Sequence, residues 1–451
     1  MASSNARVAS AGISNAAIWL TIIITCAALL LAPALWNGYP LIYPDTGGYL
    51  MRPLTGTLEL GRSALYGAFL LAGAPLAFWP NVMLQALLIA WLIALMLRVH
   101  DLRRQPWLAV AITLVLALTT SLPWFASQLM PDILFPAGVL ALYLLAYGVD
   151  RLNVVERLAL CGVIAFAISA HMAMLALALG LAVTLWLLAR IPAFAYLSPR
   201  LPAAAFAIAA GLIVAPASNA LIADEFAFTP GGASFLFGRL VEDGIVGRYL
   251  DKQCPDQTLR ICAYRNDLSR DYDDWLWKND TPFWKLGGWK GYTEEERRII
   301  LATLTSDPLA HLTTAIAHSL EQFISFRTEV ATDHDDNSHT TDTFRERLPR
   351  QYPQLIVARQ LTEQFDVSPL NWLDVPVGAL SIAGLAAVLL FRRRLGLAPR
   401  AAALGATVLL ALAINAVVCG VFSHAADRYQ SRLIPLAPLA LMVVLASRRP
   451  A

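Results

Sequence analysis

Long apolar runs with almost no charge recur along most of this chain, and they limit its fold more than any other feature. A helix needs about 20 apolar residues to cross the hydrocarbon core of a bilayer, where every backbone polar group must be satisfied within the segment. Only 15% of the 451 residues are charged and 57% are hydrophobic, far from the composition of a soluble domain. The sequence therefore predicts an all-α polytopic membrane protein.

About ten runs are expected to cross the bilayer as helices, although several are shorter than the usual length. They comprise residues 16–36, 82–97, 107–122, 133–149, 157–170, 172–189, 201–223, 373–390, 401–422 and 433–446. The first run is long for a signal peptide and has only a weak basic flank at Arg7. We interpret it as a retained signal anchor.

A further run, residues 64–78, decides the orientation of all later loops. If it crossed, the basic loop 98–104 and every later arginine-rich loop would face outward, against the positive-inside bias. If it lies along the outer interface, loops 98–104, 150–157, 190–200 and 392–400 and the tail 448–449 all become cytoplasmic. We therefore predict an interfacial helix in a multi-pass protein of the bacterial inner membrane, with its active face toward the periplasm.

The hydropathy pattern divides the chain into three parts. Residues 1–223 form an N-terminal transmembrane module with the first outer loop, 224–372 form an α-rich periplasmic segment, and 373–451 form the C-terminal transmembrane helices. Within the middle part we expect helices over 232–250, broken at Gly244, over 293–304 with Thr293 as N-cap, and over 307–326 with Asp307 as cap and Pro308 in the first turn.

Cysteine placement supports this sidedness. Cys26, Cys161 and Cys419 lie in apolar runs, whereas Cys254 and Cys262 lie in the outer segment, eight positions apart. In an oxidising compartment the latter pair is expected to form a disulfide worth about 2–3 kcal/mol. No further histidine or cysteine pair has the spacing of zinc ligands, so no metal site is predicted.

Three ionisable residues outside the basic loops are candidates for chemistry. Asp45, in the sequence Tyr-Pro-Asp-Thr just after the first run, places a carboxylate at the membrane rim, where an ionisable group is costly and more often functional than idle; the alternative is a soluble turn acid. Asp132 follows Pro131 at the start of a run, where it either takes part in catalysis or complements a helix N-terminus. His171, between two short runs, either touches substrate or marks a turn. The acidic stretch 333–342 resembles a metal-ligand set by composition only, and a solvated loop is the preferred interpretation.

Several of these features together resemble the GT-C superfamily of integral-membrane glycosyltransferases, such as the aminoarabinose and protein O-mannosyl transferases. The features are Asp45 after the first span, an interfacial helix that starts with residues 61–66, Asp132 at a later outer turn, and Asp427-Arg428-Tyr429 with Arg432 and Pro435 before the last span. The sequence departs from those branches in having a single Asp45 followed by Thr46 instead of an Asp-Glu pair, and in lacking a Lys-Pro-Pro start to the interfacial helix.

This resemblance implies an enzyme that moves a sugar from a polyprenyl-phosphate donor to an acceptor in a cell-envelope glycan, lipid or protein, with inversion. Such transfer needs a base for the acceptor hydroxyl and cations for the departing phosphate. Asp45 and Asp132 are then the catalytic candidates. The donor-phosphate ligands would be Arg428, Arg432, Arg62 and Tyr66, although interfacial anchoring explains these residues too. Further substrate contacts would be Tyr43, Tyr49, His171, Arg239 and Tyr429.

Two other functions remain open from the sequence. A transporter or flippase would couple buried acids to ions, but the chain lacks the two similar halves that such proteins show. An enzyme like an O-antigen ligase or polymerase is closer in chemistry. The expected partners are the lipid-linked sugar and the bilayer. The net charge of +2 argues against nucleic acid, and the sequence leaves a divalent cation open as a cofactor.

Overall fold

The computed structural model describes residues 2–56, 61–228, 231–254, 258–331, 337–362 and 366–447. This part of the chain is all-helical and contains no strand, only an isolated bridge between Leu41 and Gln128. The prediction of an all-α membrane protein is confirmed at this level, since five helical segments are long and apolar enough to cross a membrane.

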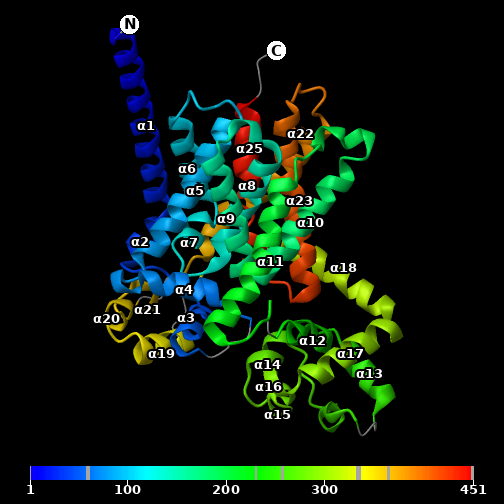
Figure 1. Cartoon of the computed structure of the whole chain (residues 1–451). Coiled ribbons are helices and arrows are strands. Elements are labelled where there is room, and N and C mark those ends of the chain that lie inside the picture. The colour runs from blue at the N-terminus through cyan, green and yellow to red at the C-terminus, as the bar shows by residue number, and fades with distance from the viewer. Residues whose placement is uncertain are drawn as a thin grey trace.

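The first part of the chain contributes most of the bundle (Figure 1). Its helices are α1 (Ala2–Leu30), α2 (Ala32–Asn37), α3 (Thr46–Thr55), α4 (Ala64–Gly73), η1 (Ala74–Leu76), α5 (Trp79–Val99), α6 (Trp107–Thr119), α7 (Leu122–Ala126), η2 (Pro131–Ile133), α8 (Leu134–Tyr147), η3 (Val149–Arg151), α9 (Val154–Ala170), α10 (Met172–Leu188), η4 (Pro192–Leu197) and α11 (Pro202–Ala223). The last part adds η6 (Ser368–Leu370), α22 (Asn371–Leu390), α23 (Pro399–Phe422), α24 (Asp427–Ser431) and α25 (Leu436–Ala446).

The helices that meet the length criterion for a span are fewer than the runs seen in the sequence. Trp79–Val99, Pro202–Ile222, Ser368–Leu390, Pro399–Phe422 and Asp427–Ala446 meet it. The other predicted runs also form helices, in α1, α6, α8, α9 and α10, but these are shorter or only partly described. Ten crossings therefore stay a prediction.

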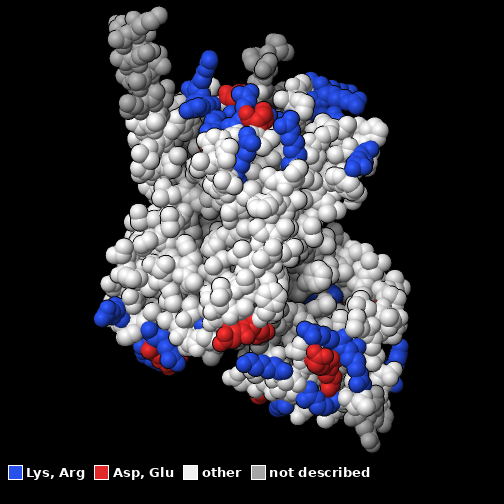
Figure 2. Space-filling model, in the orientation of Figure 1, with Lys and Arg blue, Asp and Glu red and all other residues white. Residues whose placement is uncertain are grey.

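The arginine-rich loops meet at one end of the bundle, which we call the arginine end: the loops around 98–104, 148–157, 190–200 and 392–400. Arg98 pairs with Glu156, and Arg400 pairs with Asp150 at 2.8 Å. Figure 2 shows basic side chains gathered at the top of the molecule and a middle zone of the visible face almost without charge. The prediction that these four loops share one side is confirmed as a spatial arrangement, whereas the tail 448–449 lies outside the described residues. The uncharged zone is what a bilayer requires.

Helices α3 and α4 lie at the opposite end, which we call the site end (Figure 1). They pack closely because residue 67 is a glycine: a Cβ atom there would lie 2.1 Å from the carbonyl oxygen of Tyr49. After α4 the chain reverses at Ala77 and Phe78, both with positive φ, and enters α5. Thus α4 and η1 bring the chain to the start of α5, and they place α3, with Asp45 before it, against the bundle.

The described part of residues 224–372 separates into two parts, which the sequence did not predict. One is a lobe of α12 (Gly232–Glu242), α13 (Ile245–Gln253), η5 (Arg260–Tyr264), α14 (Tyr272–Trp277), α15 (Pro282–Lys285), α16 (Gly288–Gly291) and α17 (Thr293–Ser306), connected to the bundle by α18 (Pro308–Ile324), which packs on α23. It has its own core around Phe237, Trp275 and Tyr292. The other part, α19 (Ser338–Arg347), α20 (Tyr352–Leu355) and α21 (Arg359–Thr362), packs beside α3, and Phe344 joins the core of the bundle.

Local predictions in the lobe are largely confirmed. Gly244 separates α12 from α13 with φ +68°, and Asp307 accepts a hydrogen bond from the Ala310 amide to cap α18. Cys254 and Cys262 form the predicted disulfide. The N-cap prediction for Thr293 is wrong, because Tyr292 occupies that position and the Thr293 hydroxyl instead donates to the carbonyl of Trp289 at 2.7 Å.

Candidate functional site

A cavity of about 320 Å³ opens at the site end between the bundle and the lobe. Its polar side chains come from segments far apart in the sequence: the loops before α3 and α4, η2, and α24. Its apolar wall comes from α10 and α23, with Met172, Ala176, Val418 and Phe422. A charged group thus meets an apolar wall within one small cavity.

Asp45 lies immediately before α3, in a turn that its own neighbours hold. The Tyr43 amide donates to the Thr46 hydroxyl and the Thr46 amide donates to the Tyr43 carbonyl, each at 2.9 Å. Although Asp45 occupies the N-cap position of α3, its side chain makes no capping hydrogen bond. The carboxylate instead forms an ion pair with Arg62 and lies 3.6 Å from Nη1 of Arg428. With 30% of its side chain exposed, it is the most accessible charged group of the cluster.

Asp132 is enclosed, with only 1% of its side chain exposed. Its Oδ2 accepts from Nη2 of Arg428 at 2.5 Å and its Oδ1 accepts from Nη1 of Arg432 at 3.1 Å. Both carboxylate oxygens are therefore used. Asp132 holds the two guanidinium groups in place, and Arg428 connects the two acids.

The cluster carries a surplus positive charge. Its ion pairs join three guanidinium groups, of Arg62, Arg428 and Arg432, to the two carboxylates of Asp45 and Asp132, so these five side chains carry a net charge of +1. Among the residues that the structure describes, the buried Nε of Arg428 and of Arg432 has no hydrogen-bond partner. Buried donors are almost always paired, so these N–H groups are suited to a ligand oxygen. The arrangement favours an anion.

Two of the guanidinium groups lie over aromatic rings, which help to fix their positions. The guanidinium of Arg428 lies 3.6 Å from the ring centre of Tyr43, and that of Arg432 lies 3.3 Å from the ring centre of Phe135. Such cation–π contacts stabilise a guanidinium by about 1–2 kcal/mol where it is shielded from water. Burial raises the pKa of Tyr43 to about 12, so its phenol stays neutral at ordinary pH. Asp45 is therefore better suited than this tyrosine to accept a proton.

Most residues predicted for the site do come together. The cavity is lined by Asp45, Tyr49, Arg62, Asp132, His171, Arg428, Tyr429 and Arg432. Tyr43 is not among the lining residues, but its ring packs against the guanidinium of Arg428, which is. His171 also forms the predicted turn: it precedes α10, and its Nδ1 accepts from the Ala173 amide at 3.2 Å.

Two predicted contacts are not supported by their positions. Tyr66 is fully buried and its hydroxyl donates to Oε1 of Gln85 at 3.0 Å, so it faces the bundle and not a donor phosphate. Arg239 is buried in the lobe and pairs with Asp243 at 2.8 Å, one helical turn away. Both residues are polar groups with internal partners, which the sequence cannot distinguish from ligand-binding groups.

The lobe and the end of α23 also contribute residues to the cavity, which the sequence did not predict. Phe235 of α12 reaches the cavity, and its ring lies 5.2 Å from that of Trp289. Ser423, after α23, also lines it and lies 3.2 Å from the hydroxyl of Tyr272. The amphipathic pattern of 232–242 was a signal for an apolar face, but it does not say which surface that face covers.

No metal site is apparent in the described chain, where no group of three or more His, Cys, Asp or Glu side chains is close enough to hold an ion. Residues 333–336, the first part of the acidic stretch, lie outside the described residues. Comparisons with family models, with curated proteins and with solved structures found no match. The function must therefore be argued from the cavity itself.

Proposed function

We propose that this protein is a membrane glycosyltransferase that moves a sugar from a polyprenyl phosphate to an acceptor hydroxyl at the site end. The observation that carries the proposal is a cluster of net charge +1 at the end of an apolar wall between α10 and α23. A polyprenyl phosphate has the complementary form, with an anionic head on a long apolar chain. Guanidinium groups bind phosphate with charge-assisted, often bidentate hydrogen bonds.

The roles follow from accessibility. Asp45 accepts the proton of the acceptor hydroxyl as its oxygen attacks the anomeric carbon, the bond from that carbon to the phosphate oxygen breaks, and polyprenyl phosphate departs with its bonding pair. Arg428 and Arg432 stabilise the charge that develops on the phosphate. Attack from the side opposite the phosphate inverts the anomeric centre.

Asp132 acts in this scheme as a positioning residue. Because both of its oxygens are bonded to arginines, it has no free oxygen for the acceptor, and it fixes the direction in which Arg428 and Arg432 present their remaining N–H groups. Arg62 forms an ion pair with Asp45 and acts as a positioning residue for that carboxylate. This refines the sequence-based prediction, which placed both acids among the catalytic groups.

Mass spectrometry of retained lipids tests the donor assignment. Protein purified in mild detergent should retain polyprenyl phosphate or its sugar ester. The Arg428→Gln variant should bind this lipid about 10-fold more weakly or worse, since a hydrogen bond to a charged group contributes about 1.5–3 kcal/mol. Arg327→Gln, an exposed arginine at the same end, is the matched control. Retention of other lipids only would contradict the donor class.

The extracted lipid-linked sugars then serve as donors to test Asp45. Asp45→Asn should reduce transfer by about 10²–10⁴-fold, because the amide keeps the shape but does not accept the proton. Asp342→Asn, an exposed acid on α19, is the control. Transfer above about a tenth of the wild-type rate would exclude Asp45 as the base. If a variant inactive in transfer still moves a lipid across the bilayer at the normal rate, the result would favour a transporter function.

A further inference from the structure

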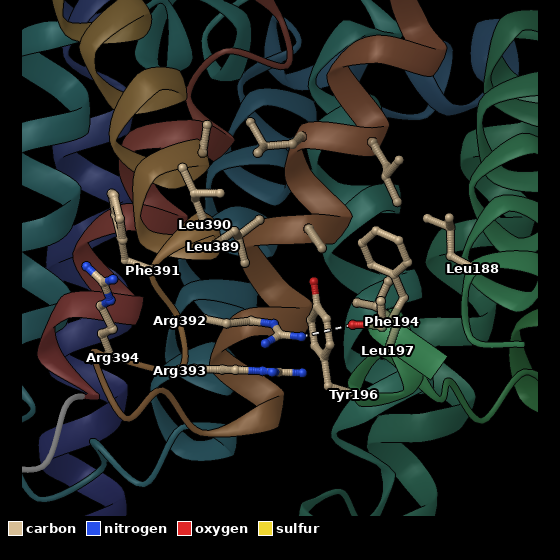
Figure 3. A pocket seen from close by; sticks show the side chains of 15 residues that line it. Leu188, Phe194, Tyr196, Leu197, Leu389, Leu390, Phe391, Arg392, Arg393 and Arg394 are labelled. Carbon is tan, nitrogen blue, oxygen red and sulfur yellow. Dashed lines mark hydrogen bonds between the residues drawn. The ribbon is translucent and has the colours of Figure 1, made fainter. Parts of the chain in front are cut away.

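A second, larger hollow lies at the arginine end, away from the Asp45 cavity. It has a volume of about 740 Å³ and is formed by the end of α10, by η4, and by the facing ends of α22 and α23. Leucine side chains line its walls, among them Leu188, Leu389, Leu409 and Leu410. The residues at its outer rim are Arg392, Arg393 and Arg394 (Figure 3).

The three arginines are not neutralised by the protein. Arg392 lies 4.2 Å from the ring centre of Tyr196 and its Nη2 donates to the Ala193 carbonyl at 2.9 Å. Figure 3 shows Arg393 extending beside Arg392 toward Tyr196, whereas Arg394 turns to the other side, next to Phe391. Within the described chain, no carboxylate forms an ion pair with any of the three, and the Arg393 guanidinium makes no hydrogen bond.

Some other arginines at the same end are paired with acids. Arg98 is bonded to Glu156, and Arg400 is bonded to Asp150 at 2.8 Å. The rim of the leucine-lined hollow is thus a local excess of positive charge above an apolar surface. Charge of this kind, at the end of a membrane bundle, attracts an anionic headgroup by about 1 kcal/mol for each arginine.

We propose that this hollow binds one anionic diacyl phospholipid of the surrounding leaflet. Its phosphate would lie against Arg392 and Arg393, and its acyl chains would cover the leucines between α10, α22 and α23. A soluble phosphate would leave the apolar walls uncovered, and an apolar peptide would leave the arginines without counter-charge. The proposal is independent of the chemistry at the Asp45 cavity, because it concerns the opposite end of the molecule.

Native mass spectrometry of delipidated protein, titrated with phosphatidylglycerol or with phosphatidylcholine of the same acyl chains, tests this. The wild type should bind one phosphatidylglycerol more tightly than phosphatidylcholine. The variant Arg392→Gln/Arg393→Gln should bind it about 30-fold more weakly, from about 1 kcal/mol for each charge. The matched control is Arg104→Gln/Arg151→Gln, which removes two exposed charges at the same end, beside a hollow that has Trp19 as its only apolar lining residue among those described.

A second variant tests the apolar half without changing charge. Leu409→Trp partly fills the hollow and should weaken phosphatidylglycerol binding while leaving the arginines in place. Equal affinity for the two lipids, equal loss in the control variant, full binding by Leu409→Trp, or displacement of the lipid by an equal concentration of inorganic phosphate would each overturn the proposal. If the double glutamine variant does not fold, Leu409→Trp and the comparison of the two lipids still decide it.

Discussion

Replacing Asp132 by asparagine should destabilise the bundle much more than the same change at Asp45. Asp132 is 1% exposed and each of its oxygens accepts from a different guanidinium. Removing its charge leaves Arg432 buried without a carboxylate, whereas Arg428 keeps Asp45 at 3.6 Å. Breaking a buried ion pair by removing one partner costs about 3–5 kcal/mol.

The corresponding loss at Asp45 should be smaller. Its side chain is 30% exposed and that of its partner Arg62 is 16% exposed, so water already screens the pair. Ion pairs near the surface contribute about 0–1 kcal/mol. Asp45→Asn is therefore expected to fold nearly as well as the wild type, and any loss of transfer can be assigned to chemistry.

Equilibrium unfolding in mixed micelles measures both changes on the same scale. In a double-mutant cycle, Asp132→Asn combined with Arg432→Met should cost less than the sum of the single changes, because the second substitution removes the unpaired buried charge. A cost below about 1 kcal/mol for Asp132→Asn, or simple additivity in the cycle, would refute the assignment of Asp132 as the residue that holds the arginines.

Three further predictions concern the lobe and the topology. Replacing Cys254 and Cys262 by serine should lower the unfolding free energy of the lobe by about 2–3 kcal/mol, measured by chemical denaturation without reductant; an unchanged midpoint would contradict this. Glu296 is fully buried, and burial raises its pKa to about 7. The stability that the protonated carboxyl contributes is therefore complete below its unfolded pKa of about 4.5, and about 3 kcal/mol of it is lost as the pH rises through 7. Glu296→Gln should flatten that pH profile of melting temperature, and an unchanged slope would exclude Glu296 as its source. In intact cells an impermeant thiol reagent should modify Thr305→Cys in the lobe but Gln105→Cys at the arginine end only after permeabilisation, and the reverse result would invert the topology.

Local features could be predicted from the sequence because they depend on neighbouring residues. Apolar runs form helices wherever they occur, since hydrocarbon leaves the backbone no other way to satisfy its hydrogen bonds. Gly244 separates α12 from α13 through its own positive φ. Asp307 caps α18 by accepting a hydrogen bond from the amide of Ala310, three residues further along the chain. Cys254 and Cys262 are close enough along the chain for their pairing to be evident.

The pairings that make the candidate site were decided by tertiary structure alone. Asp132 and Arg432 are 300 residues apart, and nothing near either residue identifies its partner. A buried arginine with an internal acid, such as Arg239, has the same appearance in the sequence as one that faces a cavity, such as Arg428. The division of residues 224–372 between a lobe and a group of helices beside α3 has the same origin. Which surface an apolar face covers depends on how the whole bundle packs, whereas whether such a face exists depends only on local periodicity.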